Sequence, residues 1–144
     1  MITGLAPLFA CLASEGTEYL VIGGIAAIAY GVPRTTLDLD LLIRANEPNA
    51  RSLLRAFESA GLGTASLTTA DALVRTEITI FQDRVRIDVL TSAPGIDFDA
   101  AYGRRNEMKI QGVSVPFISR DDLIASKKAS GRRQDLEDVH LLES

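Results

Sequence analysis

The sequence predicts one α/β domain, in which helices flank a mixed β-sheet and further helices follow at the C-terminal end. Short apolar runs of strand length alternate with segments of helical spacing. Glycine and proline residues separate these segments. The chain has 144 residues, of which 47% are hydrophobic, so a core can form without disulfides or a structural metal. We therefore treat residues 1–144 as a single domain.

In the first half of the chain, helices and strands are expected to alternate. The expected helices are residues 5–12, 25–30 and 48–61, and the expected strands are residues 19–22 and 37–43. Gly31 and Pro33 end the second helix, which is rich in alanine. Pro48 lies near the start of the third helix, and Gly61 marks its end.

The second half is expected to contain two pairs of strands and a helical C-terminus. The expected strands are residues 74–81, 85–90, 108–110 and 113–117, and the expected helices are residues 98–102, 120–130 and a last one ending at Leu142. Gln82-Asp83 and Gln111-Gly112 form the tight turns of these pairs. Ser119 is expected to cap its helix, with Asp122 in the place of a capping-box Glu.

Composition excludes several classes of protein. Cys11 is the only cysteine, so no disulfide can form within the chain, and a reducing, cytoplasmic setting is expected. The N-terminus lacks the basic segment and cleavage pattern of a signal peptide. No apolar run approaches the roughly 20 residues of a membrane span. The net charge of −4 argues against broad binding to nucleic acid, although a bound divalent cation would offset it locally.

The stretch Leu37-Asp38-Leu39-Asp40-Leu41 carries the clearest chemical signal. Side chains alternate along a strand, so the three leucines are expected to face the core. Asp38 and Asp40 then point together to the other face, roughly 7 Å apart at Cα. Two carboxylates at this spacing repel each other unless a cation lies between them, and a divalent metal ion is the usual solution.

The segment Arg84-Val85-Arg86-Ile87-Asp88 repeats this alternation. If the two strands are neighbours, Asp88 joins Asp38 and Asp40, and three carboxylates can hold one or two Mg²⁺ ions. A second interpretation stays open, in which these are solvated strand positions and Arg86 simply pairs with Asp88.

Gly23-Gly24 closes the strand that ends at Ile22 and opens a helix. Backbone without Cβ atoms can approach a ligand closely, and free N–H groups at a helix start favour a phosphate. The alternative is a strand-to-helix turn that only allows tight packing.

These motifs together resemble the DNA polymerase beta-like nucleotidyltransferase superfamily. The resemblance lies in Ile22-Gly23-Gly24, in Asp38-Leu39-Asp40-Leu41 after an interval of thirteen residues, and in Ile87-Asp88-Val89. The run from Gly23 to Gly31 and the segment Arg34-Thr35-Thr36 look like the small bacterial branch, which includes minimal nucleotidyltransferases and the abortive-infection toxin group. So does a C-terminal set of residues: Asp122-Leu123-Ile124, Lys127, Arg132, Asp135 and Asp138.

The resemblance implies a nucleotidyltransferase-type sheet and a set of site residues. Asp38, Asp40 and Asp88 would be the catalytic and metal-binding carboxylates. The nucleotide-binding residues would be Gly23, Gly24, Arg34, Thr36 and Lys127. Arg34 could instead anchor its loop to a carboxylate, and Lys127 belongs to a basic stretch that could be a solvated face. Two departures are that Gly24 stands where many active members carry serine, and that no additional domain for an acceptor is evident.

The leading functional hypothesis is Mg²⁺-dependent transfer of a nucleoside monophosphate from a nucleoside triphosphate to an unknown acceptor. The candidate acceptors are a protein, a tRNA end or a small molecule. One form of this hypothesis places the reaction within a toxin–antitoxin system. The alternative is an inactive interaction module on the same fold, such as an antitoxin or regulatory subunit. A metal-dependent nuclease is a third hypothesis, but it leaves the glycine turn unexplained. A homo-oligomer is compatible with all three, and no membrane partner is expected.

Overall fold

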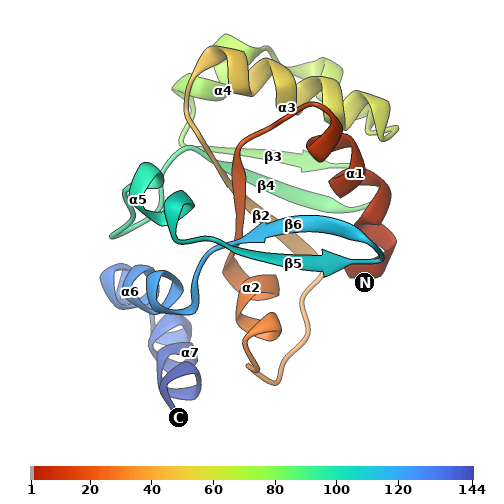
Figure 1. Cartoon of the computed structure of the whole chain (residues 1–144). Helices are drawn as coiled ribbons and strands as arrows, with labels where there is room; N and C mark the ends of the chain where they lie inside the picture. The colour runs from red at the N-terminus through yellow and green to blue at the C-terminus, as the bar shows by residue number, and fades with distance from the viewer. Residues whose placement is uncertain (1) are drawn as a thin grey trace.

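The computed structural model describes residues 2–144. Its strands form one six-stranded sheet with the order β3-β4-β2-β1-β6-β5 (Figure 1). The strands are β1 (Tyr19–Ile22), β2 (Asp38–Ile43), β3 (Ile78–Gln82), β4 (Arg86–Leu90), β5 (Asn106–Ile110) and β6 (Val113–Phe117). β2 and β4 are parallel, as are β1 and β6, while the other neighbouring strands are antiparallel. The expected mixed sheet is therefore present.

Helices cover both faces of the sheet. They are α1 (Ala6–Ser14), α2 (Gly23–Ala29), α3 (Glu47–Ser59), α4 (Ala70–Arg75), α5 (Phe98–Gly103), α6 (Arg120–Ser130) and α7 (Arg133–Glu143), with 3-10 turns at Ile2–Leu5 and Gly63–Leu67. α1, α3 and α4 lie on one side of the sheet, and α5, α6 and α7 on the other (Figure 1). None of the helices among residues 2–144 is long and apolar enough to cross a membrane.

The α3 side of the sheet holds the main core. Leu39, Leu41, Ile87 and Val89 are fully buried there, as their alternation with the aspartates predicts. The ring of Phe57 on α3 meets another core ring, that of Phe81 on β3, edge to face at 5.0 Å. Burial of this face fixes the register of β2 and β4, and so leaves their aspartates on the opposite face.

Two expectations about the strands are wrong. Leu37 is 78% exposed instead of facing the core, because β2 begins only at Asp38 and the loop before it leaves the sheet. Residues 70–75 form α4 where a strand was expected from residue 74. Thr69 caps this helix by accepting a hydrogen bond from the backbone N–H of Ala72, and that local capping outweighs the strand-like pattern of its apolar residues.

Candidate active site

The register of β2 on β4 brings the three predicted carboxylates together. Asp40 lies directly opposite Asp88, and Asp38 lies opposite Arg86. Directly opposed residues share a face, so the aspartates lie side by side on the face away from α3. All three line one cavity of about 510 Å³, together with Gly23 and Lys127. The sequence-based expectation that the two strands are neighbours is therefore correct.

Gly23 makes room for the Asp40 carboxylate at the start of α2. Its φ is +69°, and a Cβ built on it would lie 2.0 Å from Oδ2 of Asp40. No other residue type fits both the backbone conformation and this contact. The backbone amide of Gly24 opposes part of the rise in the pKa of Asp40. The turn is thus built around the carboxylate of β2.

The site concentrates negative charge. The pKa of Asp40 is raised from 3.8 to about 6, mainly by burial and additionally by the neighbouring Asp88 and Asp38 carboxylates. Arg86 supplies the nearest counter-charge, with its Nε at 3.0 Å from Oδ1 of Asp88. The pairing of Arg86 with Asp88, which the sequence left as an alternative, is therefore present in the structure.

Two of the three carboxylates are available as ligands for a divalent cation. Within residues 2–144, no group of three or more Asp, Glu, His or Cys side chains is arranged to hold a metal ion, and Arg86 contacts both oxygens of Asp88. Mg²⁺, however, is usually held by one or two carboxylates, with water and substrate phosphates completing the octahedron. Asp38 and Asp40 meet that requirement, and the crowding that raises the pKa of Asp40 is what a bound cation relieves.

Replacing Arg86 by glutamine is expected to strengthen the binding of Mg²⁺ to the nucleotide-free protein by roughly three- to tenfold, because a competing cation is removed. The melting temperature without metal should fall, and the increase on adding MgCl₂ should be larger than for the unmodified protein. Thermal denaturation over a MgCl₂ titration measures both. An equal Mg²⁺ response in the two proteins would mean that Arg86 does not compete with the cation.

Arg34, Thr36 and Gly24 meet at the same turn. A Cβ on Gly24 would lie 3.3 Å from Nη2 of Arg34 and 3.3 Å from Cγ2 of Thr36. Arg34 also forms an ion pair with Asp138 on α7, at 3.2 Å. The anchoring role that the sequence left open for Arg34 is therefore present, and it holds the guanidinium against the glycine turn.

Lys127 lines the cavity but is not a free cation. It is 6% exposed, and its Nζ lies 3.0 Å from Asp135 and 2.9 Å from Asp138. Arg132 pairs with Asp135, and Asp138 pairs with both Lys127 and Arg34. Burial alone would raise the pKa of Asp135, but hydrogen bonds from Ser130 and Lys127 outweigh it and lower the pKa. This network joins α6 and α7 to the loop before β2.

Replacing Lys127 by glutamine should lower the free energy of unfolding by about 2–3 kcal/mol, because two buried carboxylates lose a shared cation. The cost stays below that of an isolated buried charge, since Arg34 and Arg132 remain. Urea denaturation measures it, with Lys128→Gln as the matched control, because Lys128 is exposed and, among the described residues, pairs only with Glu143. Equal midpoints for the two variants would show that the network does not stabilise the fold.

The cavity also has walls that sequence reasoning missed. Ile78 on β3 and the segment Ser92-Ala93-Pro94 line it. The only sequence signal for this segment is a Pro-Gly turn directly after an acid-bearing strand.

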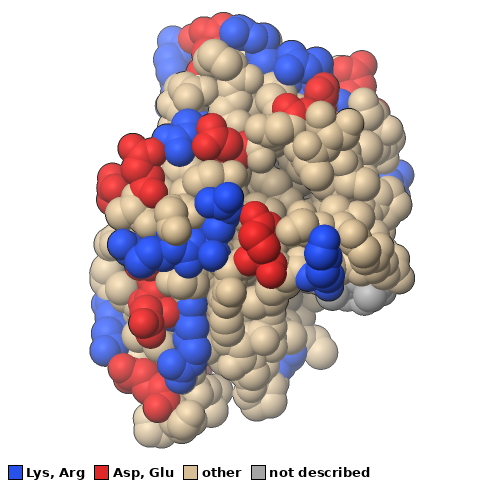
Figure 2. Space-filling model, viewed as in Figure 1, with Lys and Arg blue, Asp and Glu red and all other residues tan. Residues whose placement is uncertain are grey.

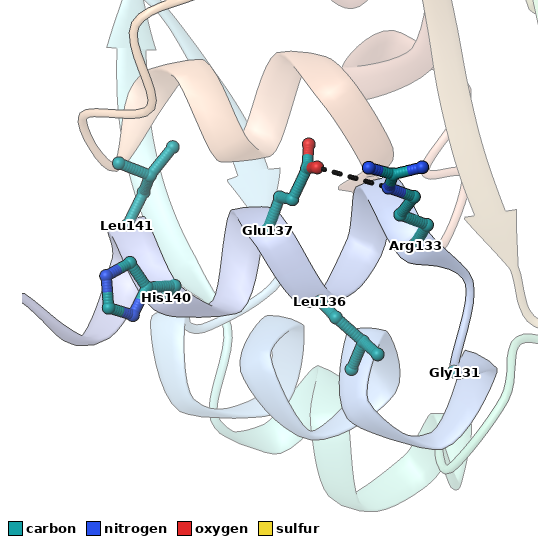
Figure 3. A pocket seen from close by; sticks show the side chains of 6 residues that line it. All are labelled: Gly131, Arg133, Leu136, Glu137, His140 and Leu141. Atoms are coloured by element: carbon teal, nitrogen blue, oxygen red, sulfur yellow. Dashed lines mark ion pairs between the residues drawn. The ribbon is translucent and has the colours of Figure 1, made fainter.

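A separate shallow hollow lies on α7 and contains none of the three aspartates. Leu136, His140 and Leu141 line it, and Arg133 pairs there with Glu137 at 3.7 Å (Figure 3). The only histidine of the chain therefore lies outside the candidate active site.

A mixed sheet flanked by helices, with the glycine-started helix packed against an acid-bearing strand, is the architecture of nucleotidyltransferases. Over residues 9–142, the chain matches the family described as "Nucleotidyltransferase of unknown function (DUF6036)", and it belongs to that family. No curated protein matches the chain.

Proposed function

We propose that this protein transfers a nucleoside monophosphate from a nucleoside triphosphate to an acceptor hydroxyl, with Mg²⁺ as cofactor. One observation carries the proposal: Asp38, Asp40 and Asp88 line a single cavity with the Gly23 turn that starts α2. A solvated strand would not require a glycine at positive φ against one of its carboxylates. Membership of a nucleotidyltransferase family supports the same chemistry.

Each residue has a role that follows from its place. Asp38 and Asp40 would hold the cation, which when bound neutralises the triphosphate and polarises the α-phosphoryl group. The start of α2 and the Arg34 guanidinium would orient the phosphates. Asp88 would accept the proton of the attacking hydroxyl after Arg86 has left its carboxylate. Thr36 packs beside Gly24 and Arg34, and these two side chains line a neighbouring cavity of about 340 Å³ rather than the acidic one.

Incubation with each labelled nucleoside triphosphate, MgCl₂ and a cell extract as the source of acceptors tests this proposal. We expect incorporation that EDTA abolishes and that Asp38→Asn reduces at least about a hundredfold. Asp71→Asn is the matched control, because Asp71 is an exposed partner of Arg75 on α4. Absence of incorporation with all four triphosphates, together with absence of Mg²⁺-dependent triphosphate binding by calorimetry, would refute the proposal.

A second candidate function is a non-catalytic interaction module, such as an antitoxin or regulatory subunit of a toxin–antitoxin pair. The internal ion pairs favour it, because Arg86 engages Asp88 and two carboxylates engage Lys127. Calorimetry separates the two functions. An enzyme requires triphosphate binding that depends on Mg²⁺, whereas a module requires tight association with a partner protein and no triphosphate binding.

A further inference from the structure

The edge strand β3 lacks the features that normally protect a sheet edge. Proteins blunt such edges with charged residues, proline or bulges. The sequence of β3, Ile-Thr-Ile-Phe-Gln, contains none of these, and Ile78 and Ile80 are 48% and 52% exposed. The opposite edge, β5, carries Glu107 and Lys109. β3 is therefore the less protected of the two edges, although the 3-10 turn Gly63–Leu67 contacts it.

The hydrogen bonds of the β3-β4 pair show which groups of β3 are free. The N–H of Thr91 donates to the carbonyl of Glu77 at 3.0 Å, and the N–H of Asp83 donates to the carbonyl of Val85 at 3.1 Å. Hydrogen-bonded pairs alternate along an antiparallel ladder. The alternate residues, Ile78, Ile80 and Gln82, therefore direct their N–H and C=O groups away from β4, and within residues 2–144 these groups have no hydrogen-bond partner.

This free edge adjoins the acidic cavity. Ile80 lies directly opposite Asp88 in the β3-β4 register, so their side chains share a face. Ile78 is itself part of the cavity wall. A strand added to β3 would lie two strand spacings, roughly 10 Å, from β4. Its residue opposite Ile80 would project from the same face as Asp88. A serine or threonine hydroxyl there would be too short to cross Ile80, whereas the longer side chain of tyrosine could extend over Ile80 to the Asp88 carboxylate.

We propose that the acceptor is an extended polypeptide segment that adds to the β3 edge and presents a tyrosine hydroxyl to Asp88. This inference rests on the proposed nucleotidyl transfer. In the step, the hydroxyl oxygen forms a bond to the α-phosphorus of a nucleoside triphosphate. The bond from that phosphorus to the bridging oxygen breaks, pyrophosphate leaves with those electrons, and the hydroxyl proton passes to the Asp88 carboxylate.

The charges favour a polypeptide over a nucleic acid. The net charge is −4. On the face that Figure 2 shows, basic side chains gather in one short band at the left, bordered by acidic side chains. The negative overall balance disfavours broad binding to phosphate backbones. Glu77 precedes β3, lines the cavity and makes no ion pair in the described part of the chain. An acceptor segment with lysine or arginine near its hydroxyl would complement it.

The test uses nine-residue peptides with a central Tyr and flanking positions drawn from Val and Lys, incubated with labelled triphosphate and MgCl₂. A matched peptide with a central Ser, whose hydroxyl is too short to reach Asp88, is expected to accept little label. Ile80→Pro removes one free N–H group of the edge, and proline is tolerated at such positions because the β4 ladder loses no bond. We expect transfer to the tyrosine peptides to fall at least tenfold in Ile80→Pro. Ile80→Val keeps the N–H group and is expected to retain most of the transfer.

A change in the peptide tests the same pairing without altering the protein. Only alternate residues of an added strand bond to β3. N-methylation of one alternate set of backbone amides should abolish transfer, and N-methylation of the other set should leave it. Equal transfer to both sets would overturn the proposal, whether or not Ile80→Pro folds.

Other outcomes also decide the question. Transfer to RNA, or to a small-molecule hydroxyl, that Ile80→Pro leaves unchanged would overturn it. So would a dimer that Ile80→Pro dissociates in sedimentation while none of the peptides is modified, because β3 would then pair with a second copy of the chain. Mg²⁺-dependent triphosphate binding, measured by calorimetry on the same samples, distinguishes failure of this inference from failure of the proposed function.

Discussion

Replacing Asp40 by asparagine is expected to abolish nucleotidyl transfer and, without metal, to stabilise the fold at neutral pH. Activity should fall by about a thousandfold or more, because one of the two carboxylates that we propose as cation ligands is lost. Stability should rise because the folded protein raises the pKa of Asp40 to about 6, through burial and its acidic neighbours. A rise of about two units in the pKa corresponds to at most about 3 kcal/mol in the free energy of unfolding.

The sign of the pH dependence follows from the direction of that shift. Because its pKa is raised, Asp40 binds its proton more tightly in the folded protein than in the unfolded chain. Between about pH 4 and pH 6, Asp40 is therefore protonated in a larger fraction of folded than of unfolded molecules. The contribution of Asp40 therefore opposes folding at neutral pH, and this penalty disappears as the pH falls through 6 toward 4. Asp40→Asn removes this contribution at every pH. Urea denaturation in EDTA at pH 7 and pH 4.5 should give a stability gain at the higher pH only.

Asp71→Asn is the control, since it removes an exposed carboxylate that does not line the cavity. If Asp40→Asn is destabilised at pH 7 in EDTA, the carboxylate is not strained by its neighbours, and the electrostatic account of the site is wrong. Addition of Mg²⁺ with triphosphate should reverse the order and make the unmodified protein the more stable of the two.

Gly23→Ala should have the second large effect, on both folding and activity. A Cβ at this position would lie 2.0 Å from Oδ2 of Asp40 and 2.9 Å from its Cγ, so the carboxylate or the turn must move. The φ of +69° adds backbone strain. We expect the free energy of unfolding to fall by about 3–5 kcal/mol, and Mg²⁺-dependent triphosphate binding to be lost in the fraction that remains folded.

Gly16→Ala separates the two causes. Gly16 has nearly the same φ, +68°, but a Cβ there would meet no atom within 4 Å. It should cost only the backbone strain, about 1–2 kcal/mol, and leave triphosphate binding intact. Urea denaturation and calorimetry on both variants provide the comparison. Similar losses in the two would indicate that contact with Asp40 contributes nothing.

Most of the candidate site follows from short-range patterns. The alternation of leucine with Asp38 and Asp40 predicts their shared face, because strand period is a local property. The glycine pair predicts a strand-to-helix turn for the same reason. The local pattern gives a wrong prediction at two places. Leu37 lies just before the first residue of β2 and so does not face the core, and the Thr69 cap starts a helix where a strand was expected. Whether Lys127 is free or paired cannot be read from sequence, because its partners lie on the next helix and fold back onto it.

The sequence by itself determined the acidic strand, the glycine turn that precedes it and the α/β class, since each depends on residues close together in the chain. Only the tertiary structure decided that Asp88 lies opposite Asp40, that Arg86 occupies the Asp88 carboxylate, and that the free groups of β3 lie beside the cavity. Those facts depend on strand order and register, which are set by burying the α3 face of the sheet as a whole. Contacts between distant segments therefore decide which charges meet, although each segment carries its own charges from the start.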